Sequence, residues 1–179
     1  MTWDEQRLFF SDLAPPLERA ALHAANSGCR DQEICQLQWV WEQRVEGVGS
    51  VFVIPEELVK NKEPRVVVLN DVAQAIVDAE RGKHPTHVFS DTPALPSRDT
   101  FYLRRRARLQ GMPIEKLRKT SELRPIDRLL SNGWKGARRR AAKRYEKELG
   151  RPCPEGFRRL HMHDFKDTFG RRLRAAGGG

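Results

Sequence analysis

The feature that most constrains the fold is a change of hydrophobic period in the middle of the N-terminal half. Three β-rich runs lie there, Val40–Val45, Ser50–Ile54 and Arg65–Leu69, and glycines 47 and 49 mark a turn between the first two. The flanking segments show the three-to-four-residue spacing of amphipathic helices. Short strands with short links favour antiparallel pairing. The sequence therefore predicts an α+β fold, mostly helical, with a small three-stranded antiparallel sheet.

Capping residues set the expected helix ends. Thr2 and Glu5 form a capping box, Asn70 is a typical N-cap, and Gly150 followed by two prolines is a typical helix stop. The expected helices cover about residues 2–11, 17–26, 31–37, 70–80, 131–149 and 164–176. In the fifth helix an apolar face runs from Trp134 to Leu149. The last helix turns Phe165, Phe169 and Leu173 inward, and we expect Phe169 and Leu173 to be partly uncovered.

The chain of 179 residues is expected to form one domain. Residues from about 91 to 129 mix turn signals with basic residues, so we expect a long loop or insertion there that holds one short helix. No apolar run approaches the roughly 20 residues that span a bilayer, and the N-terminus does not resemble a signal peptide. Together with three unpaired cysteines, this predicts a cytoplasmic protein with no membrane partner.

Charge divides the chain into two unlike halves. Residues 1–100 hold 10 Lys/Arg and 16 Asp/Glu, a net charge of −6, whereas residues 101–179 hold 23 and 8, a net charge of +15. Such asymmetry is typical of a surface that faces a polyanion, and the alternative is a solvated basic surface. Cys153, His161 and His163 do not have the spacing of a four-ligand zinc site, so neither a metal nor a cofactor is expected.

Several cations stand at the ends of predicted elements. Arg30 follows Gly28 at the start of a helix, where its guanidinium can bind a phosphate or pair with Asp31 or Glu33. Lys60 lies between the second and third strands, and is either an exposed loop lysine or a group that donates a proton to a leaving oxygen. Lys62 is equally well placed for that role.

A second pair of groups opens the last predicted helix. His163 and Lys166 are three residues apart, which places them on one side of a helix. His163 can contact a phosphate or shuttle a proton, although a structural role is the alternative.

Three stretches, in this order, carry a family resemblance: NSGCRDQE, VKNKEPRVVVLN and HDFKDTFG. The first resembles T-G-x-R-x-x-E, the second K-x-x-K-x-R-x-V-P-L and the third H-x-L-R-H-T, which are motifs of the tyrosine recombinase (phage integrase) catalytic domain. SNGWKGARRRAA also resembles the helix before the third motif. The resemblance covers nearly the whole chain except about residues 91–129.

The resemblance implies a metal-free DNA strand exchange. A tyrosine attacks the scissile phosphate, cations stabilise the phosphoryl charge, and the hairpin lysine protonates the 5′-oxygen. It also implies double-stranded DNA and other recombinase protomers as partners, and a bacterial or phage-derived origin. The catalytic residues implied are Arg30, Lys60, His163 and Lys166, and the DNA-binding residues expected with them are Lys62, Arg65, Arg138, Arg139 and Arg171. Arg138 and Arg139 are expected on the exposed side of the helix that contains Trp134.

The chain departs from the family pattern at several positions. Lys166 replaces an arginine, Asp167 replaces the second histidine, and no tyrosine follows His163. Tyr102 lies in the predicted insertion and Tyr145 on the packed face of a helix. We therefore expect a catalytic domain that lacks its C-terminal tyrosine segment, binds DNA and cleaves no strand alone. The alternatives are a non-catalytic nucleic-acid-binding module and a structural remnant without a partner.

Overall fold

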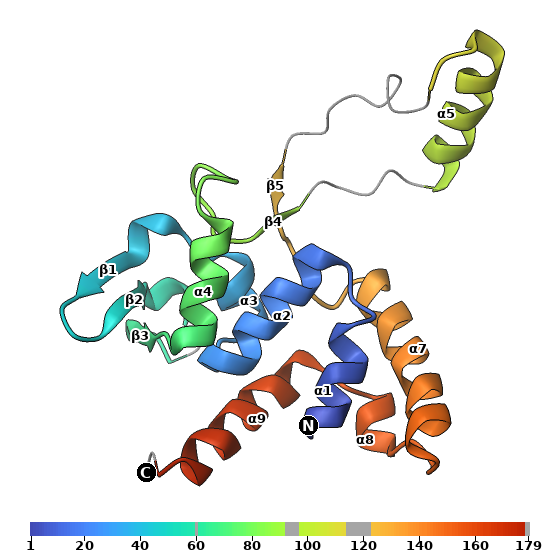
Figure 1. Ribbon diagram of the computed structural model, residues 1–179. Coiled ribbons are helices and arrows are strands. Elements are labelled where there is room, and N and C mark those ends of the chain that lie inside the picture. The colour runs from blue at the N-terminus through green and yellow to red at the C-terminus, as the bar shows by residue number, and fades with distance from the viewer. Residues whose placement is uncertain (60, 92–96, 114–122, 178–179) are drawn as a thin grey trace.

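The structure is a computed structural model that describes residues 1–59, 61–91, 97–113 and 123–177, with the side chains of helix 97–110 described from Arg104 onward. The α-helices are α1 (Trp3–Phe10), α2 (Pro15–Ser27), α3 (Asp31–Cys35), α4 (Asp71–Glu80), α5 (Ser97–Gln110), α7 (Asn132–Leu149), α8 (Glu155–Arg158) and α9 (Met162–Ala175). The strands are β1 (Glu42–Val45), β2 (Gly49–Ile54), β3 (Arg65–Val68), β4 (Ser90–Asp91) and β5 (Arg124–Pro125). The predicted α+β class is confirmed (Figure 1).

The main sheet has the strand order β1-β2-β3, and both pairs are antiparallel, as predicted. Phe52 of β2 stands opposite Glu42 on one side and Val67 on the other. The first strand begins two residues later than expected, because Trp39–Trp41 form a 3-10 turn, η1. The indole of Trp39 donates a hydrogen bond to the carbonyl of His84, which ties this turn to the segment after α4.

The caps predicted for the helices are present. Thr2 and Glu5 form the capping box of α1, and the Asn70 side chain accepts a hydrogen bond from the backbone N–H of Ala73 at the start of α4. Gly150 ends α7 in the left-handed region. These local interactions satisfy backbone groups that a helix end leaves unpaired.

The core is centred on Trp134 of α7, whose side chain is almost fully buried. Its ring lies edge-on to Phe9 of α1 at 4.7 Å and to Phe165 of α9 at 5.5 Å, and its indole donates to the carbonyl of Leu160. The inward face predicted for α7 is therefore confirmed. In α9 Phe165 is buried, as expected, whereas Phe169 is half-buried and Leu173 is 49% exposed, which agrees with the expectation that these two are partly uncovered.

The segment predicted as an insertion starts and ends at a two-stranded ribbon. Ser90–Asp91 of β4 pair antiparallel with Arg124–Pro125 of β5, and α5 lies between these strands in the chain. Figure 1 shows α5 standing apart from the other helices. At 14 residues α5 is longer than the short helix expected. The core resumes before residue 129, since Ile126 and Leu129 are buried.

No helix in the described ranges is both long enough and apolar enough to cross a bilayer.

Candidate functional site

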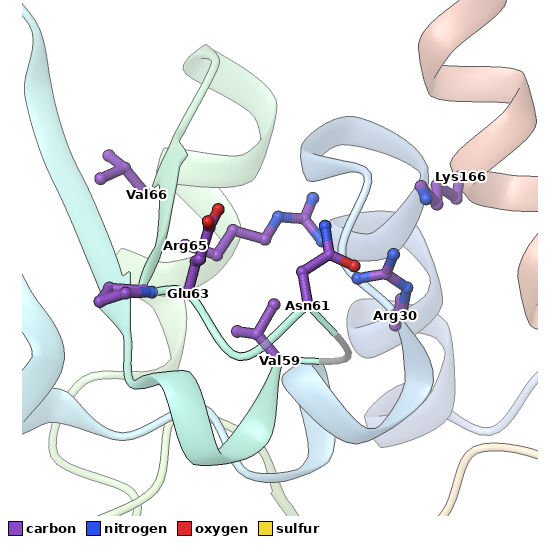
Figure 2. A pocket seen from close by; sticks show the side chains of 8 residues that line it. Arg30, Val59, Asn61, Glu63, Arg65, Val66 and Lys166 are labelled. Carbon is purple, nitrogen blue, oxygen red and sulfur yellow. The ribbon is translucent and has the colours of Figure 1, made fainter.

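Cations from three separate elements line one open hollow on the surface. Arg30 comes from the N-cap of α3, Arg65 from the start of β3, and Lys166 from α9; the β2–β3 link adds Asn61 (Figure 2). The volume of the hollow is about 360 Å³, which is at the low end for small-ligand sites. Arg30 and Lys166 are far apart in the sequence, so only the tertiary fold brings them together.

Gly28 is the residue that allows this approach. It ends α2 with a left-handed φ of 65°, and a Cβ placed on it would lie 2.7 Å from Cδ1 of Phe169 in α9. Such a separation is well inside van der Waals contact, so no other residue fits without movement. Because Arg30 follows two residues later and Lys166 precedes Phe169 by less than one turn, the close contact sets both cations at one hollow.

The two arginines share one buried carboxylate. Glu33, whose side chain is only 1% exposed, accepts hydrogen bonds from the backbone N–H of Arg30 at 2.8 Å, from Nη1 of Arg30 at 2.8 Å and from Nη1 of Arg65 at 2.5 Å. Nη2 of Arg65 also donates to the carbonyl of Gly28 at 2.9 Å. The ion pair that the sequence offered as an alternative role for Arg30 is therefore formed.

That ion pair does not bury the guanidinium groups. The side chain of Arg30 stays 33% exposed and that of Arg65 25% exposed, and both line the hollow. Their common carboxylate holds each group in a defined place and leaves donors facing solvent, as a bidentate contact with phosphate requires. The geometry thus combines an anchored pair of guanidinium groups with one flexible ammonium.

A second hollow adjoins the first along α9. It is lined by Asp164, Lys166, Asp167, Gly170, Arg171 and Arg174. Lys166 belongs to both hollows, so the two form one groove in which five cations face three carboxylates, those of Glu63, Asp164 and Asp167. Arg174 was not predicted. It lies eight residues after Lys166, and this spacing on one helix indicates that the two residues lie on similar sides of α9.

His163 is not among the described residues that line this groove. Its side chain is 71% exposed, and its Nε2 lies 4.0 Å from a carboxylate oxygen of Asp167. Asp167 also lines the second hollow. The structure therefore brings Arg30 and Lys166 together but places His163 to one side of them.

The hairpin lysine predicted as a proton donor, Lys60, lies outside the described residues. Its neighbours Val59 and Asn61 both line the first hollow. Lys62 is exposed and has a left-handed φ of 55°, an uncommon conformation for a residue with a side chain. Asn61 was not predicted as a site residue, although its position next to Lys60 could have indicated that it lies near the same site.

One of the predicted DNA contacts on α7 is placed differently from the prediction. Arg138 was expected on the exposed side of the helix, but it is partly buried and its Nη1 donates to the carbonyl of Leu160 at 3.3 Å. Trp134, one turn earlier, donates to the same carbonyl. Arg139 is exposed as expected, and so is Arg171 in the second hollow.

Other reactive groups near the core are protected. Tyr145 is 2% exposed, as its helical position predicted, and the side chain of Tyr102 lies outside the described part. Burial raises the pKa of the Cys29 thiol to about 11, so it stays protonated at neutral pH. In the described ranges no three His, Cys, Asp or Glu side chains gather as metal ligands would.

Comparison of the chain with protein-family models, with curated proteins and with solved structures finds no match. What the groove can do is therefore inferred from its own residues. It offers anchored guanidinium groups and an ammonium to an anion, and its described lining residues include no hydroxyl or thiol side chain.

Proposed function

We propose that this chain is a DNA-binding domain of the tyrosine recombinase type, in which the groove along α9 holds the phosphate backbone of a duplex. The observation that carries this proposal is that Arg30, Arg65 and Lys166 line one hollow although they come from three elements. The resemblance of the surrounding motifs assigns two of these residues, Arg30 and Lys166, to a phosphate clamp. A guanidinium fork and an ammonium together match the charge and geometry of a phosphodiester.

Such a clamp lowers the barrier to strand cleavage only when a nucleophile is present. Tyr145 is buried in the core and is not available to attack a phosphate. Tyr102, the other tyrosine, lies between β4 and β5 and outside the three motifs that carry the resemblance. We therefore propose that this chain forms no covalent link with DNA by itself, and that a recombinase protomer with its own tyrosine supplies the nucleophile in trans. When that tyrosine attacks the phosphate, Lys60 of this chain protonates the leaving 5′-oxygen.

The second candidate is a non-catalytic nucleic-acid-binding module. The position of His163 favours it, because the imidazole does not line the hollow that Arg30 and Lys166 share. Asp167 also favours this candidate, because it adds a negative charge to the groove where the family motif has a histidine. In this case the groove binds backbone phosphate and has no part in strand exchange.

The binding step is tested by fluorescence anisotropy on a 30-base-pair duplex over a range of salt concentrations. We expect Arg30→Gln and Lys166→Gln each to weaken binding and to reduce the log–log salt slope by about 0.9, the value for one phosphate contact. Arg159→Gln is the matched control, since Arg159 is exposed and already paired with Glu155 on α8. Equal losses in all three variants would contradict the groove.

The covalent step is tested with a nicked suicide substrate and denaturing electrophoresis. The chain alone should give no protein–DNA band. A band formed only with a complete recombinase, and lost in Arg30→Gln but kept in Arg159→Gln, supports the recombinase assignment. DNA binding through the groove without any band in either mixture supports the non-catalytic module.

A further inference from the structure

Helix α5 carries an unusual concentration of positive charge. Four of the five residues from 104 to 108 are arginines, interrupted only by Ala107, and all four arginines are exposed. Going along the sequence, no Asp or Glu stands three or four residues before or after any of them. Within the described residues they also take part in no ion pair.

The basic helix α7 shows that this is not the general pattern of the chain. Arg140 pairs with Asp12 at 3.2 Å, and Arg144 pairs with Glu148 at 3.0 Å and with Asp12 at 3.3 Å. The cations of α7 are thus partly neutralised by carboxylates on the helix itself and on the α1–α2 link. The cations of α5 have no comparable partners in the described structure, although acidic residues are plentiful in the first hundred positions.

This arrangement works against the helix when nothing is bound. Arg104 and Arg108 are four residues apart, and Arg105 and Arg108 three apart, so like charges face each other at helical spacing. A helix of 14 residues is only marginally stable without tertiary packing, and Figure 1 shows α5 apart from the other helices. An anionic partner would remove the repulsion and stabilise the helix.

We propose that α5 is a second nucleic-acid contact, separate from the groove along α9, and that it binds the phosphate backbone of duplex DNA. Arg104, Arg105 and Arg108 project within an arc of roughly 100° around the helix axis. The residues from 104 to 108 span about 6 Å along that axis, which is close to the axial distance covered by two phosphate steps on one strand. One face of α5 can therefore contact neighbouring phosphates.

The composition of α5 favours nucleic acid over a membrane surface. The large apolar residues in the sequence of α5 are Phe101, Tyr102, Leu103 and Leu109. A helix that lies in a bilayer interface needs a broad apolar face opposite its basic one. At about 100° per residue, the position of Arg105 falls between those of Phe101 and Leu109, so the apolar positions form no unbroken face. A helix that binds phosphates needs no such face.

A second contact on the same chain changes how affinity depends on the length of the DNA. Once one surface is bound, the other binds as an intramolecular event, so a duplex long enough to reach both is held more tightly than a short one. α5 follows β4 and precedes β5, which attach it to the body at a single ribbon. We therefore expect α5 to contribute to binding on long duplexes and little on short ones.

The test removes the four arginines of α5 together, as Arg104→Gln, Arg105→Gln, Arg106→Gln and Arg108→Gln in the full chain. The charge-matched control removes four exposed arginines that already have an acidic or aromatic partner, by changing Arg7, Arg128, Arg151 and Arg159 to Gln. Far-ultraviolet circular dichroism and urea unfolding establish that both variants are folded. A third variant, with lysine at the four α5 positions, keeps the charge.

Binding is measured by anisotropy on 12- and 40-base-pair duplexes as a function of salt. We expect the α5 glutamine variant to bind the long duplex at least tenfold more weakly and to reduce its log–log salt slope by about 2–4, at about 0.9 per phosphate contact. The short duplex should be affected much less, and the lysine variant should keep most of the slope.

Equal losses in the α5 and control variants would overturn the inference, because net charge alone would then explain them. It would also fail if the α5 variant lost binding to phosphatidylserine vesicles but kept its affinity for DNA. Loss of long-duplex binding in the α5 variant, with Arg30→Gln unaffected, would support α5 and contradict the groove. The two surfaces are therefore tested independently.

Discussion

At the scale of single residues, His23 is the clearest source of pH dependence. Its ring is fully buried on α2 beside Phe89, and neither ring nitrogen has a hydrogen-bond partner among the described residues. Burial lowers the pKa of His23 from its ordinary 6.5 to about 4. Between these values the unfolded chain binds a proton that the folded chain does not, so acid favours unfolding.

We therefore predict that the contribution of His23 to stability is constant above about pH 6.5 and falls as the pH drops toward 4, by about 3 kcal/mol in total. The measurement is urea unfolding at a series of pH values for the wild type and for His23→Leu, which cannot titrate. The variant should lose this part of the pH dependence. Parallel curves for the two proteins would show that His23 is accessible to protons in the folded state.

Gly28 is the second residue with a single structural role. A side chain there is strained twice, by the left-handed φ and by the ring of Phe169 at 2.7 Å. We predict that Gly28→Ala lowers the free energy of unfolding by about 2–4 kcal/mol, the sum of a backbone cost and an overpacking cost.

The matched control is Gly150→Ala, because Gly150 also has a left-handed φ but a Cβ placed on it would meet no described atom within 4 Å. It should lose only about 1–2 kcal/mol, the backbone cost alone. Chemical denaturation of both variants makes the comparison, and a further Phe169→Leu change should restore part of the loss in Gly28→Ala only. If the two glycine variants were equally destabilised, α2 and α9 would not be in close contact.

At the scale of elements, α7 is held to α1 and α9 chiefly by Trp134. Its ring is almost fully buried between Phe9 and Phe165. We predict that Trp134→Ala lowers the free energy of unfolding by about 3–5 kcal/mol, as large-to-small changes of buried aromatics do. The control is Trp3→Ala, since Trp3 is 69% exposed and the guanidinium of Arg172 stacks on its ring. Similar denaturation midpoints for the two variants would contradict the packing of α7.

At the scale of the whole molecule, the positive charge of the C-terminal half is only partly available to a partner. Some arginines of α7 are paired, and Arg138 donates to a backbone carbonyl, whereas Arg139 and Arg171 are exposed. We predict that Arg139→Gln and Arg171→Gln each reduce the salt slope of DNA binding by about 0.9, while Arg138→Gln leaves the slope unchanged and lowers stability instead.

Salt titrations and thermal unfolding of the same three variants check this division. The Arg138 variant acts as the internal control, because it removes the same charge from a neighbouring position. A uniform fall in slope for all three would mean that DNA binding depends on net charge and not on which arginines are exposed.

The amino-acid sequence by itself determined the features that depend on near neighbours. The capping box at Thr2 and Glu5, the N-cap at Asn70, the glycine stop at Gly150 and the inward face of α7 follow from side chains within about four residues of each other. The short links between the three β-rich runs determined the antiparallel pairing of the sheet. The caps and helix stops depend on residues close in sequence, so they can be predicted without knowledge of the tertiary structure.

The tertiary structure alone decided which polar groups meet. Arg138 was predicted to be exposed from its place on the helix. In the structure its guanidinium instead donates a hydrogen bond to the carbonyl of Leu160, from a distant part of the chain. Glu33 serves two arginines, one of them from a strand 32 residues away, and no local pattern indicates that the carboxylate is shared. His163 and Lys166 share a side of α9 in sequence, yet only Lys166 lines the groove with Arg30. The physical reason is that helical periodicity states which face a residue occupies, whereas burial and pairing depend on what packs against that face from distant parts of the chain.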